Sequence, residues 1–215
     1  MPEQSLHIQI KDYYRQPNDL VEGHVWDYIV DIIRGDQLIE IQTGNFQSIR
    51  DKVRRLLKAY KVRIVYPLVI QKWVIREEGI KRIRRVSQHR GRIEEIFNEL
   101  VYSPDLALNP NFSLEVLFIH SEEDQEVKWK GKKRTKYRVV EKRLVKVLNS
   151  ITYSKPDDYL SLLPVGLETA FTARELSKRT SMRITLARRM VYCLSKMGLL
   201  KEVGIVARAK LYKIK

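Results

Sequence analysis

The segment DIIRGDQLIEIQ, residues 31–42, most constrains what this chain can fold into. The glycine–aspartate pair at 35–36 is a two-residue hairpin signal, because glycine readily adopts the positive φ that such a turn requires. In the register set by that turn, Asp31 lies directly across from Glu40. Side chains alternate between the two faces of a strand, so Gln42 shares the face of these two acids. The segment therefore predicts an antiparallel hairpin with three polar side chains on one face.

Apolar residues on both faces of this hairpin disfavour an ordinary solvent-exposed surface. The opposite face is expected to carry Val30, Ile32, Ile39 and Ile41, and the polar face to carry Ile29, Ile33 and Leu38 as well. At a separation of about 5 Å and an effective dielectric near 20, ionised Asp31 and Glu40 would repel by roughly 3 kcal/mol. A cross-strand pair contributes at most about 1 kcal/mol, so pairing alone does not offset this repulsion. A shared proton, a neighbouring arginine or a divalent cation would relieve it, and carboxylate oxygens are ligands that Mg²⁺ prefers.

Hydrophobic periodicity predicts the elements around the hairpin. They are a helix over 3–14, strands over 20–26, 28–33 and 37–42, a helix over 46–60 and a strand over 61–69. The succession of strand, helix and strand indicates a βαβ crossover, whose two strands are parallel. Further along, the pattern predicts a basic connector over 81–92, a helix over 92–102, a strand over 113–120 and a helix over 138–150. The expected fold class is therefore α/β.

The order of these elements, with Asp31 on the second strand and Glu40-Ile41-Gln42 on the third, resembles the PD-(D/E)XK nuclease superfamily over residues 3–70. This is the fold of many restriction enzymes and junction resolvases. The resemblance implies a restriction-endonuclease-like mixed sheet flanked by helices, in which Asp31, Glu40 and the carbonyl of Ile41 hold Mg²⁺. It also implies that Gln42 orients the attacking water, and that Glu22 stands where some members carry an additional acid.

Gln42 is the main departure from the superfamily pattern, because lysine is usual at that position. Lysine can orient water and offset negative charge, whereas a neutral amide can only orient. Some members of the superfamily use glutamine here, and others recruit a lysine from a neighbouring helix, for which Lys11 and Lys52 are the nearest candidates in this sequence. A core that keeps the fold without catalysis is the third alternative.

The C-terminal segment has the element order of a winged helix-turn-helix. Thr172 and Glu175 form a capping-box pattern at the start of a helix over 171–180, a second helix over 182–197 follows, and residues 199–214 are expected to form two strands. Together with the stretch RGRIEEIFNELV, this part resembles an uncharacterised prokaryotic family that joins a nuclease-like core to a winged helix.

The charge of the chain indicates a polyanionic partner, and nucleic acid is the leading candidate. The formal net charge is +15, with +1 in residues 1–70, +6 in residues 71–150 and +8 in residues 151–215. A solvated surface that serves solubility is the alternative. The candidate DNA-binding residues are Arg183, Thr185, Arg188 and Arg189 on the second helix, Arg208 and Lys210 on the wing, and Lys132, Lys133, Arg134 and Lys136 in the basic stretch KGKKRTK.

The sequence thus predicts a nuclease-like core over residues 1–80, a basic mixed α/β connector over 81–150 and a winged helix over 151–215, packed together in a cytoplasmic protein. One cysteine and four scattered histidines offer neither a disulfide framework nor a zinc-finger spacing. No apolar run is long enough to span a membrane. The function expected is a Mg²⁺-dependent endonuclease acting on double-stranded DNA, for which a homodimer would supply two active sites. The alternatives are a non-catalytic DNA-binding protein or regulator with a nuclease-like scaffold, and an RNA-binding or RNA-processing protein.

Overall fold

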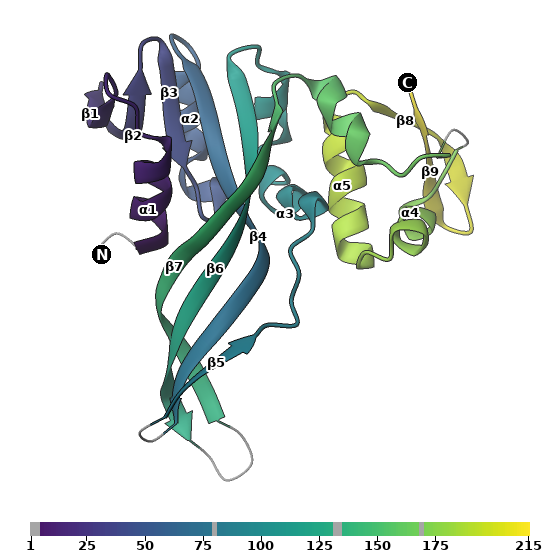
Figure 1. Cartoon of the computed structure of the whole chain (residues 1–215). Helices are drawn as coiled ribbons and strands as arrows, with labels where there is room; N and C mark the ends of the chain where they lie inside the picture. Colours follow the sequence, from purple (N-terminus) through teal and green to yellow (C-terminus); the bar gives the residue numbers. More distant parts are fainter. Residues whose placement is uncertain (1–4, 79–80, 131–134, 168–169) are drawn as a thin grey trace.

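A large mixed sheet with helices on both faces forms the body of the protein (Figure 1). The structure is a computed structural model that describes residues 5–78, 81–130, 135–167 and 170–215. The sheet has the strand order β1-β2-β3-β4-β6-β7, with β5 paired to β4. Strand β4 is parallel to both β3 and β6, and the other pairs are antiparallel. The expected α/β class with a mixed sheet flanked by helices is therefore confirmed.

The elements before residue 62 follow the sequence pattern closely. They are α1 (Ser5–Tyr14), β1 (Leu20–Val25), β2 (Tyr28–Arg34), β3 (Gln37–Ile41), a 3-10 turn (Phe46–Ser48) and α2 (Arg50–Leu56). Helix α1 buries Leu6 and Ile10 against one face of the sheet. Helix α2 buries Val53 and Leu56 in the cluster on the other face. The expected crossover is confirmed, since α2 connects β3 to the parallel strand β4.

Two strands that are much longer than the sequence indicates, and a third that it does not predict, extend the sheet into an arm (Figure 1). They are β4 (Lys61–Glu78), β6 (Phe112–Lys130) and β7 (Thr135–Tyr153), and β5 (Lys81–Val86) pairs with the far half of β4. The helix predicted over 138–150 is wrong, because that segment lies in β7. Its apolar residues fit both periods, and pairing with β6 along almost the whole strand outweighs local helix propensity. The basic connector expected over 81–92 likewise begins as a strand.

A second unit follows the sheet, made of α4 (Ala173–Thr180), α5 (Ile184–Lys196), β8 (Leu200–Val206) and β9 (Ala209–Ile214). The capping box is confirmed: the Thr172 hydroxyl accepts from the Glu175 N–H at 3.2 Å, and the Glu175 carboxylate accepts from the Thr172 N–H at 2.7 Å. Helix α5 buries Ala187, Met190, Val191 and Leu194 as expected. The unit therefore has the element order helix, helix and hairpin that its sequence predicts.

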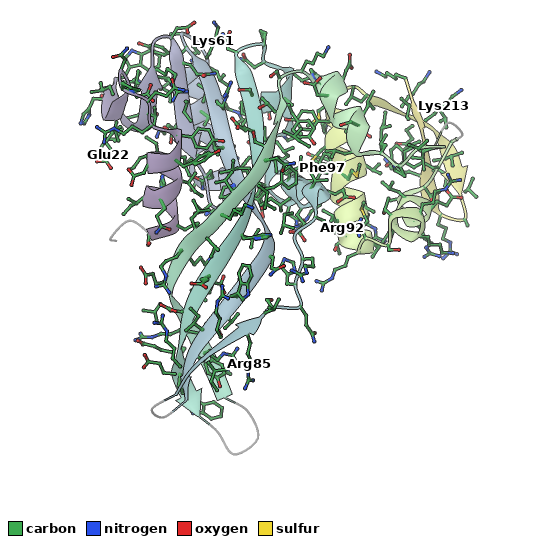
Figure 2. The ribbon with its side chains drawn as sticks, in the orientation of Figure 1. Glu22, Lys61, Arg85, Arg92, Phe97 and Lys213 are labelled. Atoms are coloured by element: carbon green, nitrogen blue, oxygen red, sulfur yellow. The ribbon has the colours of Figure 1, made fainter. Side chains whose placement is uncertain are left out.

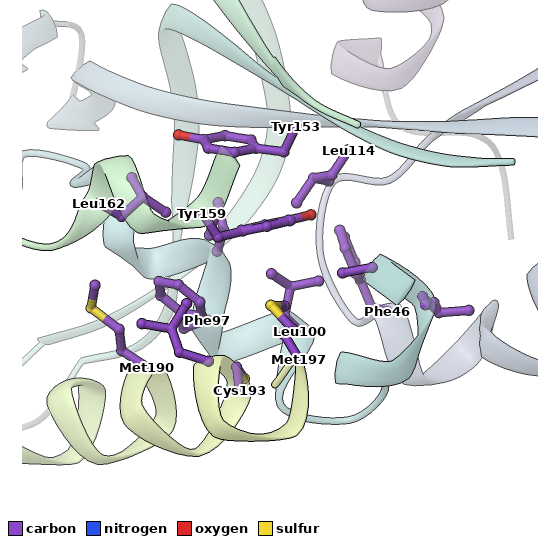
Figure 3. Close-up of a cluster of buried hydrophobic side chains, with 14 of the residues drawn as sticks. Phe46, Phe97, Leu100, Leu114, Tyr153, Tyr159, Leu162, Met190, Cys193 and Met197 are labelled. Atoms are coloured by element: carbon purple, nitrogen blue, oxygen red, sulfur yellow. The ribbon is translucent and has the colours of Figure 1, made fainter. Parts of the chain in front are cut away.

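One continuous hydrophobic cluster joins this unit to the sheet (Figure 3). Phe97, at the start of the short helix α3 (Phe97–Leu100), is fully buried beside Tyr159, with ring centroids 6.5 Å apart. Tyr159 in turn stacks on Tyr153 at the end of β7, at 4.8 Å. Cys193 of α5 is buried in the same cluster, and burial raises its pKa to about 12, so its thiol stays protonated in the core. The two units therefore pack on a common hydrophobic core and are not merely connected by a flexible linker.

Candidate active site and basic clefts

The β2–β3 hairpin has the register that its turn predicts, but the ladder ends one pair before the two acids. Ile32 pairs with Ile39, and Ile33 with Leu38. Beyond this point the carboxylate Oδ2 of Asp31 accepts the N–H of Ile41 at 2.7 Å. A side chain thus takes the place of a main-chain acceptor where the strands part.

The backbone around Asp31 departs from regular strand geometry, which changes one of the expected faces. Val30 lies in the cluster of Leu38, on the side of α2, whereas Ile32 lies in the cluster of Ile39, on the side of α1. The expectation that Val30 and Ile32 share a face is therefore wrong, because strand alternation is broken between them. The expectation that Asp31 and Glu40 share one face is wrong for the same reason, since Asp31 contacts His7 of α1 and Glu40 contacts Lys52 of α2. In β1, Glu22 has a φ of 53°, a left-handed conformation that non-glycine residues seldom adopt.

Helix α1 supplies the basic groups around Asp31. The Nε2 atom of His7 lies 3.1 Å from Oδ2 of Asp31. Lys11, one turn further along, is buried and donates to Oε1 of Glu22 at 2.6 Å. Burial favours a raised pKa for Asp31, but the hydrogen bonds from His7 and from the Ile41 N–H, with the charges of His7 and Lys11, lower it below its usual range. Asp31 is therefore held ionised.

Helix α2 supplies the basic group beside Glu40. Glu40 is 5% exposed, and its Oε1 atom lies 2.6 Å from Nζ of Lys52. Lys52 also donates to the carbonyl of Ile29 at 2.5 Å, which fixes its position over the hairpin. Burial raises the pKa of Glu40 to about 7; the charge of Lys52 opposes this rise and the charge of Asp31 adds to it. The two acids therefore lie within electrostatic reach of each other.

Of the other predicted catalytic residues, Lys11 and Glu22 join this site and Gln42 does not point toward it. The Gln42 amide donates to the carbonyl of Gly44 and, at 3.2 Å, to that of Asn45. A cation held by Asp31 and Glu40 would meet oxygen donors that suit Mg²⁺, and it would compete with His7 and Lys52. In the part of the chain that the structure describes, no group of three or more His, Cys, Asp or Glu side chains has a metal-binding arrangement.

Sequence reasoning missed His7 and a second polar cluster, which joins Tyr14 of the same helix to two residues of the sheet. The hydroxyl of Tyr14 donates to Oε1 of Glu115 at 2.6 Å, and Arg63 donates to Oε2 at 3.2 Å. Burial, with the Glu115 carboxylate, raises the pKa of Tyr14, so its hydroxyl stays protonated. His7, Lys11 and Tyr14 are spaced by four and three residues, which places them on one side of α1. That spacing was the signal available in the sequence.

Replacing Glu40 with glutamine is expected to stabilise the fold more at pH 8 than at pH 5. The pKa of the Glu40 carboxyl group rises from 4.5 to about 7 on folding. Its protonated form therefore stabilises the folded state below pH 4.5, and this contribution to the free energy of unfolding is lost as the pH increases to about 7. At about 1.4 kcal/mol per unit, the difference between the two pH values is up to about 3 kcal/mol. Urea denaturation of wild type and Glu40→Gln at both pH values measures it. Glu77→Gln, at an exposed position, serves as the control. An equal effect of Glu40→Gln on the free energy of unfolding at both pH values would contradict the raised pKa of Glu40.

The predicted DNA-binding residues of α5 are all exposed, but they face two different clefts. Arg183, Thr185 and Arg189 line a cleft of about 490 Å³ that α5 forms with residues 89–98. Arg188 lines a groove of about 710 Å³ on the other side of α5. Arg208 and Lys210, in the β8–β9 hairpin, line this second groove, and Lys210 pairs with Glu202 at 2.9 Å.

The basic stretch of the β6–β7 hairpin lies apart from α5. Lys136 is exposed near the end of the arm, with its Nζ atom 5.9 Å from the ring centre of Trp129. Figure 1 shows the arm and the α4–α5 unit pointing in different directions. Lys132, Lys133 and Arg134 lie outside the residues that the structure describes.

Residues 4–154 match the family described as "Domain of unknown function (DUF8091)". The chain belongs to this family. The DUF8091 match runs from α1 to the end of β7, so it contains the Asp31–Glu40 site and ends before α4. A protein of Treponema pallidum (strain Nichols), described as "Uncharacterized protein", is 27% identical over 180 residues, which cover 82% of this chain and 72% of that protein. No solved structure matches the chain. Among the described residues, no helix is both long and apolar enough to cross a membrane.

Proposed function

We propose that this protein binds double-stranded DNA and hydrolyses phosphodiester bonds with Mg²⁺ at Asp31 and Glu40, on a restriction-endonuclease-like core. The observation that carries the proposal is the arrival of two lysines at the acid pair from the flanking helices. Lys52 of α2 contacts Glu40 at 2.6 Å, and the charge of Lys11 of α1 acts on Asp31. These are the two lysines that the sequence offers in place of the one missing at position 42.

The groups at this site have separate tasks in the proposed reaction. Asp31, Glu40 and the Ile41 carbonyl would hold Mg²⁺, which supplies an activated water and charge stabilisation when bound. Lys52 would offset negative charge that develops on the phosphate, a contribution of the kind that fixed cations make in phosphoryl transfer. His7 and the Ile41 N–H keep Asp31 ionised and in place. Burial raises the pKa of Glu40 to about 7, and a cation bound beside it would favour the ionised carboxylate.

The C-terminal unit supports the DNA-binding part of the proposal. Its element order is that of a winged helix, and α5 presents exposed arginines beside two basic clefts. In a winged helix, the second helix enters the major groove and the wing lies near phosphates. On this proposal α5 is the recognition helix and the turn at Arg208 is the tip of the wing.

Replacing Asp31 with asparagine is expected to abolish both Mg²⁺ binding and plasmid nicking while the fold is retained. The asparagine oxygen can still accept the N–H of Ile41, but the charge is lost. Removing a partner of a metal ligand typically costs about 10- to 100-fold in affinity or activity, so loss of a ligand should cost at least about 100-fold. Calorimetric titration with Mg²⁺ and nicking of supercoiled plasmid measure the two effects. Equal nicking by wild type and Asp31→Asn would refute the assigned site.

A non-catalytic DNA-binding protein is the second candidate, and the position of Gln42 favours it. The Gln42 side chain is engaged by the carbonyls of Gly44 and Asn45, so it is not aimed at a water beside the acids. The same experiment decides between the two functions. Wild-type protein that binds duplex DNA but neither binds Mg²⁺ nor nicks plasmid would identify the core as a scaffold.

A further inference from the structure

The cleft between residues 89–98 and the start of α5 has basic walls from two parts of the chain about 90 residues apart. One wall carries His89, Arg90 and Arg92, and the other carries Arg183 and Arg189. Thr185, Ser181 and Asn98 add polar side chains, and Glu95 is the only acid among the residues that line the cleft. Figure 2 shows Arg92 beside α5, whereas Glu22 lies on the opposite side of the sheet body. Glu22 accepts a hydrogen bond from Lys11, whose charge acts on Asp31. This cleft is therefore separate from the Asp31–Glu40 site.

Specific contacts hold the two walls in a fixed relation. Arg92 donates to the carbonyl of Thr180 at 2.8 Å, and Arg189 donates to the Asn98 side chain at 2.6 Å. Gly91 lies against β4: its N–H donates to the carbonyl of Val69 at 3.0 Å, and an added Cβ would come within 2.4 Å of that oxygen. Only glycine fits this close approach. The loop is thus anchored, with one arginine on each side of Gly91.

Not all the arginines of the cleft are engaged by the protein itself. Arg92 pairs with Glu94 at 3.1 Å, and Arg189 is bound to Asn98. Arg90 and Arg183 are exposed, and within the described parts of the chain neither has an acidic partner within 4.0 Å. Two exposed guanidinium groups on opposite walls of the cleft, without carboxylates to neutralise them, can bind phosphate groups.

We propose that the loop His89–Arg92 is a second DNA-contacting element, and that Arg90 binds the phosphodiester backbone of duplex DNA opposite Arg183. The inference rests on the proposed function, because it names where bound DNA contacts the protein outside the helix–wing unit. It adds a contact from the DUF8091 part of the chain to those of the C-terminal unit. The contact positions the duplex and carries no sequence specificity, since phosphate is the same at every base pair.

The test is binding of a fluorescent 20-base-pair duplex, measured by anisotropy in EDTA so that no hydrolysis occurs. Arg90→Gln and Arg183→Gln are each expected to weaken binding about tenfold and to lower the slope of log affinity against log salt by about 1. Glu95→Gln is expected to tighten binding, because it removes the acid from the cleft. Lys58→Gln removes one exposed positive charge at the end of α2 and should leave affinity and slope unchanged. Thermal melting of each variant confirms that the fold is retained.

Failure of this inference differs from failure of the proposed function. Duplex binding by wild type that is unaltered in Arg90→Gln overturns the role of the loop and leaves DNA binding intact. Absence of duplex binding by wild type overturns the proposed function, and this inference with it. At least tenfold preference for duplex RNA over duplex DNA in competition overturns the choice of DNA. Loss of binding in Arg90→Gln and Lys58→Gln alike would show an effect of net charge and would also overturn the inference.

Discussion

Replacing Lys52 with methionine is expected to lower the rate of Mg²⁺-dependent plasmid nicking by about 100- to 1000-fold, the loss typical when one fixed charge-stabilising group is removed from an active site. Methionine retains most of the aliphatic stem of lysine, so the packing of α2 over the hairpin is kept. The ammonium group that lies 2.6 Å from Glu40 is lost. If Lys52 takes the place of the lysine absent at position 42, removing the charge of any exposed arginine of α2 should have a much smaller effect.

The pH profile separates a chemical role of Lys52 from a structural one. The charge of Lys52 lowers the pKa of Glu40, which burial has raised to about 7. Without that charge the carboxyl group ionises at higher pH, so the pH at which nicking reaches half its maximum should move upward in Lys52→Met. Lys52→Arg keeps the charge and should restore part of the rate. Lys58→Met, which removes an exposed lysine just after α2, is the control. A wild-type rate in Lys52→Met from pH 6 to pH 9 would show that Lys52 has no part in the reaction.

Replacing Phe97 with alanine is expected to destabilise the protein by about 3–5 kcal/mol, the usual cost of truncating a fully buried phenylalanine. Phe97 is 0% exposed and packs in the cluster that contains Tyr159 and Cys193 (Figure 3). Because the sheet and α5 both contribute to this cluster, the protein should still unfold in one cooperative transition, with its midpoint at a lower urea concentration. Urea denaturation followed by circular dichroism measures the change in free energy of unfolding.

Leu108→Ala is the matched control for Phe97→Ala, because Leu108 is apolar but 50% exposed. Its substitution should cost less than about 1 kcal/mol. Hydrogen exchange of the backbone amides gives a second readout: amides of α5 and of β6 should lose protection together in Phe97→Ala. Loss of protection confined to α5 would mean that the C-terminal unit unfolds by itself and that the shared core does not couple the two parts.

Local chemistry determined the elements that the sequence predicts correctly. The turn at Gly35 set the register of the β2–β3 hairpin, and φ at Gly35 is 58°, as such a turn requires. Thr172 and Glu175 determined where α4 begins. The apolar stripe from Ala187 to Leu194 determined the buried side of α5. In each case the free energy that decides the conformation comes from residues within a few positions of one another.

Tertiary structure alone decided the rest, because the deciding contacts join residues far apart in the chain. Residues 138–150 became part of β7 through pairing with β6, although their apolar spacing also fits a helix. The surroundings of Asp31 and Glu40 were decided by α1 and α2, which bring His7 and Lys52 to the two acids from opposite faces of the sheet. The basic cleft exists because Arg92 reaches Thr180, 88 positions away. The sequence by itself determined which acids and arginines are candidates for the proposed sites. Long-range packing decided which side chains and main-chain groups they contact.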